Sequence, residues 1–137
     1  MVIDTSPLIA FALGEPSRDR LLDALETAKD PVLSAISLLQ AGMILRARLG
    51  ERAVNLLYQL VDELVSEVVP FDGTQARLAL TAFGRFGKGM GPRAQLNLGD
   101  CAYALAGSRG EPVLATGNGF AATDLPCCQT LATHGSA

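Results

Sequence analysis

Two β-branched residues lead directly into a carboxylate and two hydroxyls in the stretch Val2-Ile3-Asp4-Thr5-Ser6, which is followed by Pro7. A short apolar run of this kind is typical of a buried strand in a parallel sheet. Ser6 and Pro7 suit the N-cap and the first position of a helix. Asp4 is therefore expected at the carboxyl end of a strand, where open parallel sheets bind their ligands.

The rest of the sequence alternates short apolar runs with amphipathic segments. Strands are predicted at residues 32–33, 67–70 and 112–116, and helices at residues 7–13, 21–28, 35–49, 51–65, 72–86 and 98–106, with a helical turn at 120–125. Such alternation predicts a parallel α/β sheet with right-handed crossovers. We expect one domain over residues 1–137, with roughly the last ten residues frayed.

The composition excludes several classes of protein. With 49% hydrophobic residues the chain can build a core, yet its apolar runs are far shorter than a membrane span, and the N-terminus lacks the positive region of a signal peptide. Three cysteines in no framework spacing favour a reducing cytoplasm. Together with His134 they also match no zinc-finger or ribbon spacing, so a zinc site is not expected.

The positive charge is unevenly distributed. The net charge of −3 disfavours a protein that binds nucleic acid over its whole surface. Residues 83–98, however, contain no acid and carry Arg85, Lys88 and Arg93. These three cations are candidates for contacting RNA phosphates, and the alternative is a solvated polar loop.

Polar residues gather at the predicted strand ends and on the adjoining helix faces. They are Asp4, Thr5, Gln40, Asp100, Thr116, Asn118 and Asp124. Carboxylates that converge within 4 Å repel one another by about 4 kcal/mol per pair at an effective dielectric of 20, so such a cluster implies a cation. Hard oxygen ligands are those that Mg²⁺ prefers. Each acid considered alone has a structural alternative: Asp100 can serve as a helix-cap residue and Asp124 as a turn residue.

Four motifs in this order carry a resemblance to a known family. They are residues 2–6, residues 34–40 (Ser34-Ala35-Ile36-Ser37-Leu38-Leu39-Gln40), residues 96–101 (Leu96-Asn97-Leu98-Gly99-Asp100-Cys101) and residues 116–124, from Thr116-Gly117-Asn118-Gly119-Phe120 to Thr123-Asp124. In this order and spacing the chain resembles the PIN-domain toxins of VapC type, the ribonuclease halves of bacterial type II toxin–antitoxin pairs. The resemblance extends to about residue 125.

The resemblance implies a three-layer α/β/α fold with a short central parallel sheet of four to five strands. It also implies metal-assisted hydrolysis of RNA, with Mg²⁺, or Mn²⁺ in its place, held by four acids. Asp4 matches the first acid and Asp100 the third, so these two are the expected metal ligands. Gln40 stands where the family usually has Glu, and Gly119 where it usually has Asp. We expect weaker metal binding, because affinity for a hard cation follows ligand charge.

The remaining polar residues match secondary positions around those acids. They are Thr5, Ser6, Thr116, Asn118 and Asp124. The resemblance further implies an RNA substrate, a small VapB-like antitoxin, a homodimer and a cytoplasmic location without membrane attachment. Leu56, Leu57, Leu60 and Leu64 are candidates for an exposed apolar surface, although burial in the core is the alternative.

Two other functions compete with a ribonuclease toxin. The first is a catalytically inactive PIN domain that dimerises and binds RNA, or an antitoxin peptide in an apolar groove between helices. The second is a phosphotransferase of haloacid-dehalogenase type with Asp4 as nucleophile. That family requires a second aspartate two residues after the first, and Ser6 occupies this position.

Overall fold

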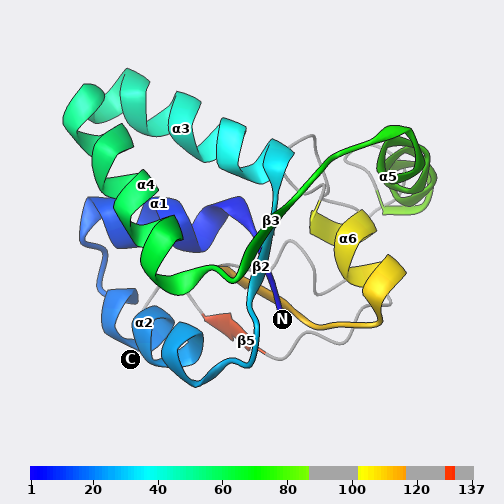
Figure 1. Cartoon of the computed structure of the whole chain (residues 1–137), viewed down its shortest axis with the longest axis horizontal. Helices are drawn as coiled ribbons and strands as arrows, with labels where there is room; N and C mark the ends of the chain where they lie inside the picture. Colours follow the sequence, from blue (N-terminus) through cyan, green and yellow to red (C-terminus); the bar gives the residue numbers. More distant parts are fainter. Residues whose placement is uncertain (87–101, 117–128, 132–137) are drawn as a thin grey trace.

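The computed structural model of the chain describes residues 1–86, 102–116 and 129–131, which form a parallel sheet covered by helices (Figure 1). The described strands are ordered β3-β2-β1-β4-β5. Their bounds are β1 Val2–Ile3, β2 Val32–Ser34, β3 Glu67–Val69, β4 Val113–Thr116 and β5 Gln129–Leu131. Every pairing is parallel, and β1 lies at the centre with Val2 opposite both Val32 and Val113. The predicted parallel sheet of four to five strands is confirmed.

Helices lie on both faces of this sheet. They are α1 Thr5–Leu13, α2 Arg18–Thr27, α3 Ala35–Leu49, α4 Glu51–Leu64, α5 Gly73–Phe86 and α6 Ala102–Arg109. Figure 1 shows α1 to α4 on one side of the strands and α5 and α6 on the other. The three-layer α/β/α architecture is therefore confirmed. In the described part of the chain, no helix combines the length and the apolar character that crossing a membrane requires.

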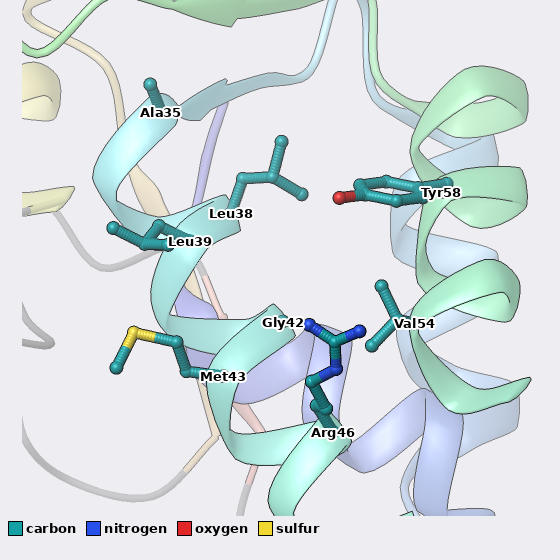
Figure 2. Close-up of a pocket in the computed structure, with 8 residues that line it drawn as sticks. All are labelled: Ala35, Leu38, Leu39, Gly42, Met43, Arg46, Val54 and Tyr58. Atoms are coloured by element: carbon teal, nitrogen blue, oxygen red, sulfur yellow. The ribbon is translucent and has the colours of Figure 1, made fainter. Parts of the chain in front are cut away.

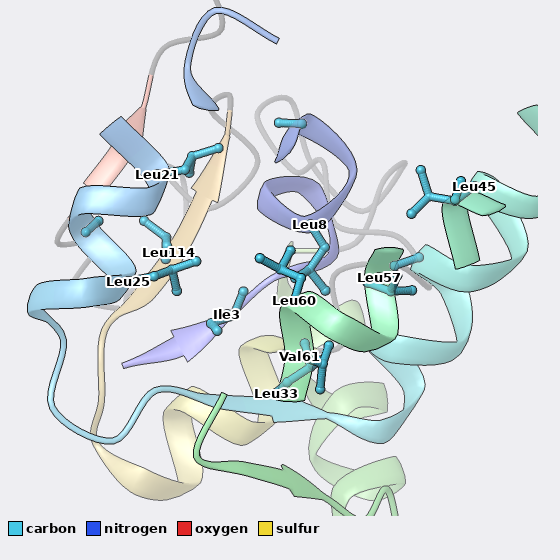
Figure 3. Packing of buried hydrophobic residues seen from close by; sticks show 14 residues of the cluster. Ile3, Leu8, Leu21, Leu25, Leu33, Leu45, Leu57, Leu60, Val61 and Leu114 are labelled. Carbon is cyan, nitrogen blue, oxygen red and sulfur yellow. The ribbon is translucent and has the colours of Figure 1, made fainter. Parts of the chain in front are cut away.

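The pleat of the sheet divides the core between its two faces. Ile3, Leu33 and Leu114 point from neighbouring strands toward α1–α4 and are fully buried (Figure 3). Val2 and Val113, which alternate with them, pack against α6 on the opposite face. Burying one such side chain contributes about 1.5–3 kcal/mol. The two apolar faces hold β1 between two layers and leave its carboxyl end as the place where polar groups can collect.

Glycines end two of the helices that pack on the larger core, which is the buried cluster between the sheet and α1–α4. Gly14 follows α1 with a φ of 67°, and its N–H donates to the carbonyl of Phe11 over 3.2 Å. Gly50 separates α3 from α4 with a φ of 85°. Residues other than glycine rarely adopt a positive φ. The two glycines therefore allow the chain to reverse its direction tightly at these positions. As a result α3 and α4 pack side by side as a helical hairpin.

Four predictions about the elements were wrong or incomplete, and one is the start of α2, which begins at Arg18 and not at residue 21. The first helix begins at Thr5, with Asp4 and not Ser6 as its N-cap. Helix α6 continues to Arg109, beyond the predicted end at residue 106. Strand β5 was not predicted, because its residues fall in the tail that was expected to fray; pairing with β4 corrects that expectation for residues 129–131. The predicted helical turn at 120–125, the predicted helix start at residues 98–101 and the last six residues lie outside the described part.

Candidate functional site

Asp4 lies at the carboxyl end of β1 and caps the helix that follows. Its carboxylate oxygen Oδ2 accepts hydrogen bonds from the Ser6 backbone N–H, 3.3 Å away, and from the Ser6 hydroxyl, 2.8 Å away. The residue is only 4% exposed. A carboxylate is a good N-cap because it satisfies backbone N–H groups that have no partner within the helix. Asp4 therefore has a structural role in addition to any chemical one.

Ser6 connects this carboxylate to the end of β4. The backbone N–H of Thr116 donates to the Ser6 hydroxyl over 2.9 Å. Because the hydroxyl oxygen accepts there, its own proton is directed to Asp4. The Asp4 backbone N–H also donates to the carbonyl of Leu114 over 3.0 Å. Two predicted secondary polar residues, Ser6 and Thr116, are thus brought together with Asp4.

Thr5 connects the same strand end to α3. Its hydroxyl lies 3.2 Å from Oε1 of Gln40 and 3.5 Å from the backbone carbonyl oxygen of Ser37. Thr5 is almost fully buried, whereas the Gln40 side chain is half-buried. Helix α3 therefore places the side chain of Gln40 next to Thr5, at the carboxyl end of β1.

Ser37 is a residue of this region that was not chosen as a site candidate. It is fully buried one helical turn before Gln40, and within the described part of the chain its hydroxyl has no hydrogen-bond partner. A buried hydroxyl without a partner is unusual in a folded protein. Its spacing of three residues from Gln40 was the available signal.

The described part of the site supplies oxygen donors but little charge. Asp4 contributes one carboxylate, and Thr5, Ser6 and Gln40 contribute neutral groups. Among the described residues no group of three or more His, Cys, Asp or Glu side chains could hold a metal ion. The donors therefore fit a hard cation such as Mg²⁺ in kind, since all are oxygens, and a complete site requires a further anionic ligand.

Several predicted site residues cannot be compared with the structure. Those outside the described residues are Lys88, Arg93, Asp100, Asn118, Gly119 and Asp124, as well as the three cysteines and His134. Their roles remain predictions. Arg85, the remaining candidate for contacting RNA, is exposed on the last turn of α5.

A separate groove lies between α3 and α4 and has a volume of about 330 Å³. Figure 2 shows Leu38 of α3 and Tyr58 of α4 facing each other across it, with Arg46 opposite Val54. The lining is mainly apolar, and Arg46 is paired with Glu51. This groove does not include Gln40, so it is a second candidate surface and not part of the strand-end site.

The leucines proposed for an exposed apolar surface divide along α4. Leu57 and Leu60 are buried in the larger core, with 1% and 5% of their surface exposed. Leu64 is partly buried and packs against that core, while Leu56 is 38% exposed. Of the four, Leu56 is therefore the one whose side chain reaches the surface.

The sequence and the fold match a known class of protein. Residues 1–125 match the PIN domain family, and the chain belongs to it. It is 41% identical over 124 residues to ribonuclease VapC28 of Mycobacterium tuberculosis, covering 90% of this chain and 93% of that protein. It is 40% identical over 128 residues to ribonuclease VapC of Mycolicibacterium smegmatis, covering 91% and 97%. These similarities identify a PIN domain of the VapC type.

A solved structure supports the same fold. VapC20 of Mycobacterium tuberculosis, described as a toxin that cleaves the sarcin–ricin loop, superposes with a TM-score of 0.72 at 17% sequence identity. The match covers 91% of this chain and 95% of VapC20. At this identity the likeness concerns the arrangement of helices and strands.

Proposed function

We propose that this protein is an endoribonuclease, the toxin of a type II toxin–antitoxin pair, and that it hydrolyses RNA phosphodiester bonds. The observation that carries the proposal is the buried Asp4 carboxylate, held by Ser6 at the carboxyl end of β1 in a VapC-type PIN domain. A carboxylate in this place has the position and the charge that binding a cation at the strand ends requires.

PIN-domain ribonucleases generally depend on a divalent metal. We propose Mg²⁺, with Mn²⁺ as a substitute, held by Asp4 and Asp100. When bound, such an ion supplies an activated water and stabilises charge on the scissile phosphate. Ser6 orients the Asp4 carboxylate by donating to Oδ2. Thr5 holds Gln40 through the hydrogen bond between their side chains, and we propose that Thr116, Asn118 and Asp124 complete the polar surroundings of the metal.

We propose that RNA lies along the cationic segment that includes Arg85, Lys88 and Arg93. Contacts from these residues to phosphates hold the backbone without reading sequence. Because Gln40 and Gly119 carry no negative charge, we expect the activity of this chain to be lower than that of a PIN domain with acids at both positions.

The second candidate function is a catalytically inactive PIN domain that binds RNA or an antitoxin peptide. It is favoured by Gln40 and Gly119, which carry no negative charge at two positions where the family usually has acids. Under either function we propose a VapB-like antitoxin partner, with the apolar α3–α4 groove as the surface for its peptide, and a homodimer. We place the protein in the cytoplasm, where its proposed RNA substrate and antitoxin are found.

The deciding experiment measures cleavage of a labelled RNA by the purified protein with Mg²⁺, with Mn²⁺ and with excess EDTA. The ribonuclease proposal expects cleavage that EDTA abolishes and that the Asp4→Asn variant lacks. Undiminished cleavage in EDTA would overturn the metal-dependent mechanism.

A second arm compares the unchanged protein with the double variant Gln40→Glu, Gly119→Asp. If the double variant cleaves RNA and the unchanged protein does not, the family role is supported and this chain is the inactive binding form. If neither protein cleaves RNA nor binds Mn²⁺, the ribonuclease proposal fails.

A further inference from the structure

Gln40 places a neutral amide directly beside the Asp4 strand end. Its side chain is half-buried on α3, and its Oε1 lies 3.2 Å from the hydroxyl of Thr5, the residue that follows Asp4. Asp4 and Thr5 are 4% and 6% exposed, so the amide is the more accessible polar group of the three. A molecule entering the site therefore meets Gln40 early.

The amide keeps a hydrogen-bond donor for such a molecule. It has two N–H donors, whereas the Thr5 hydroxyl has one proton and two acceptors within reach, Gln40 Oε1 and the Ser37 carbonyl. If the proton is directed to Gln40, both amide N–H groups point away from Thr5. If it is directed to Ser37, the amide turns over and gives one N–H to Thr5. In both arrangements at least one amide N–H of Gln40 is not used in the hydrogen bond with Thr5.

Because the Gln40 amide is neutral, it favours some ligands over others. A neutral amide adds little to the binding of a divalent cation, which requires anionic oxygen ligands. An N–H donor aimed at a charged phosphate oxygen makes a charge-assisted hydrogen bond, which is stronger than one between neutral groups. In the described part of the chain, Thr5 is the one hydrogen-bond partner of the Gln40 side chain, so nothing described there competes for the remaining donor.

We propose that Gln40 binds a phosphate oxygen of the RNA backbone through its amide N–H and is not a metal ligand. The inference rests on the proposed ribonuclease function and assigns Gln40 to substrate binding within the same site. A carboxylate at this position would have the opposite preference, because it would attract the cation and repel the phosphate. Affinity for RNA in the absence of metal therefore distinguishes the two roles.

The first measurement is fluorescence anisotropy of a labelled single-stranded RNA bound to the full chain in EDTA. We expect Gln40→Met, which keeps the length of the side chain without its polar atoms, to weaken RNA binding about five- to tenfold. Gln40→Glu should weaken it further through repulsion. The matched control is Gln59→Glu, the same change at an exposed position on α4, which should stay within about twofold because no phosphate donor is lost there.

The second measurement is calorimetric titration of the same proteins with Mn²⁺. We expect Gln40→Met to bind Mn²⁺ within about twofold of the unchanged protein and Gln40→Glu to bind it at least tenfold more tightly, since ligand charge increases. Loss of Mn²⁺ affinity in Gln40→Met would overturn the inference, because it would make the amide oxygen a ligand. Gln40→Glu keeps an acceptor for Thr5, so it covers the case in which Gln40→Met fails to fold: RNA binding in EDTA by Gln40→Glu that stays within about twofold of the unchanged protein would then overturn the inference.

The outcomes also separate this inference from the proposed function. RNA binding in EDTA that is unchanged in both Gln40 variants overturns the role of Gln40 and leaves the ribonuclease proposal standing. Absence of RNA binding by the unchanged protein, with and without Mn²⁺, overturns both.

Discussion

The backbone N–H of Thr116 donates a hydrogen bond to the hydroxyl of Ser6 over 2.9 Å, although 110 positions separate the two residues in the chain. The same hydroxyl donates to Asp4 over 2.8 Å. One side chain therefore holds the carboxylate at the end of β1 and the last residue of β4 in a fixed relation. The orientation of the proposed metal ligand depends on this contact.

Ser6→Ala is expected to remove both hydrogen bonds of that hydroxyl. We expect unfolding free energy to fall by about 1–3 kcal/mol, because partly buried partners on two strands lose a bond. Mn²⁺ affinity should fall as well, while Ser6→Thr, which keeps a hydroxyl, should restore most of it. Urea unfolding and calorimetry measure the two effects. Ser66→Ala, at an exposed serine, is the control. Normal Mn²⁺ affinity in Ser6→Ala would show that Ser6 does not orient Asp4.

Asp4 is expected to have separable structural and chemical roles. Asn caps helices about as well as Asp, whereas Ala costs about 0.5–2 kcal/mol at an N-cap. Asp4→Asn should therefore unfold at nearly the same urea concentration as the unchanged protein but lose Mn²⁺ binding and RNA cleavage. Asp4→Ala should lose stability too. If Asp4→Asn retained Mn²⁺ affinity, the carboxylate would not be a metal ligand.

Neighbouring leucines on α4 provide a test of the larger core. Leu57 is 1% exposed and packs in the cluster between the sheet and α1–α4, whereas Leu56 is 38% exposed. Leu57→Ala should reduce the unfolding free energy by about 2–5 kcal/mol, because it leaves a cavity. Leu56→Ala on the same helix should cost about 0.5 kcal/mol or less. Similar losses in urea unfolding for the two variants would contradict the packing described here.

Arg85 is expected to contribute to RNA binding through charge alone. Each phosphate contact to a single strand changes the slope of log affinity against log salt by about 0.7. Arg85→Gln should lower RNA affinity and reduce that slope by about this amount, without changing sequence preference. Anisotropy titrations at several salt concentrations provide the slope, and Arg52→Gln, at an exposed arginine on α4, is the control. Equal slopes for Arg85→Gln and the unchanged protein would exclude Arg85 from the RNA path.

Local pattern predicted most of the elements because their signals lie within single segments. The apolar run before Asp4 predicted β1, and the spacing of apolar residues bounded by Gly50 predicted α3 over residues 35–49, as observed. The same kind of signal placed Asp72 before α5, where its carboxylate accepts from the Gln75 N–H over 2.9 Å. Strand β5 has no such local signal, because an edge strand of this kind is specified by pairing with β4.

Part of the candidate site was also predicted, because its residues lie within single segments that have a local signal. Asp4, Thr5 and Gln40 were recognised from their places at a strand end and on a helix face, and the structure brings them together. The sequence analysis assigned the N-cap to Ser6, whereas the structure has Asp4 there. Both residue types suit an N-cap, so the local sequence does not distinguish them. Burial of Thr5 under α3 decides between them, because a helix that begins at Thr5 directs its hydroxyl toward Ser37 and Gln40.

The sequence by itself determined the alternation of strands and helices, the position of Asp4 at a strand end and membership of the PIN-domain class, because these follow from periodicity and from motifs along one chain. Only the tertiary structure decided that Ser6 joins Asp4 to Thr116 and that Thr5 pairs with Gln40. Hydrogen bonds between residues far apart in sequence depend on how the layers pack, and packing is a property of the whole fold.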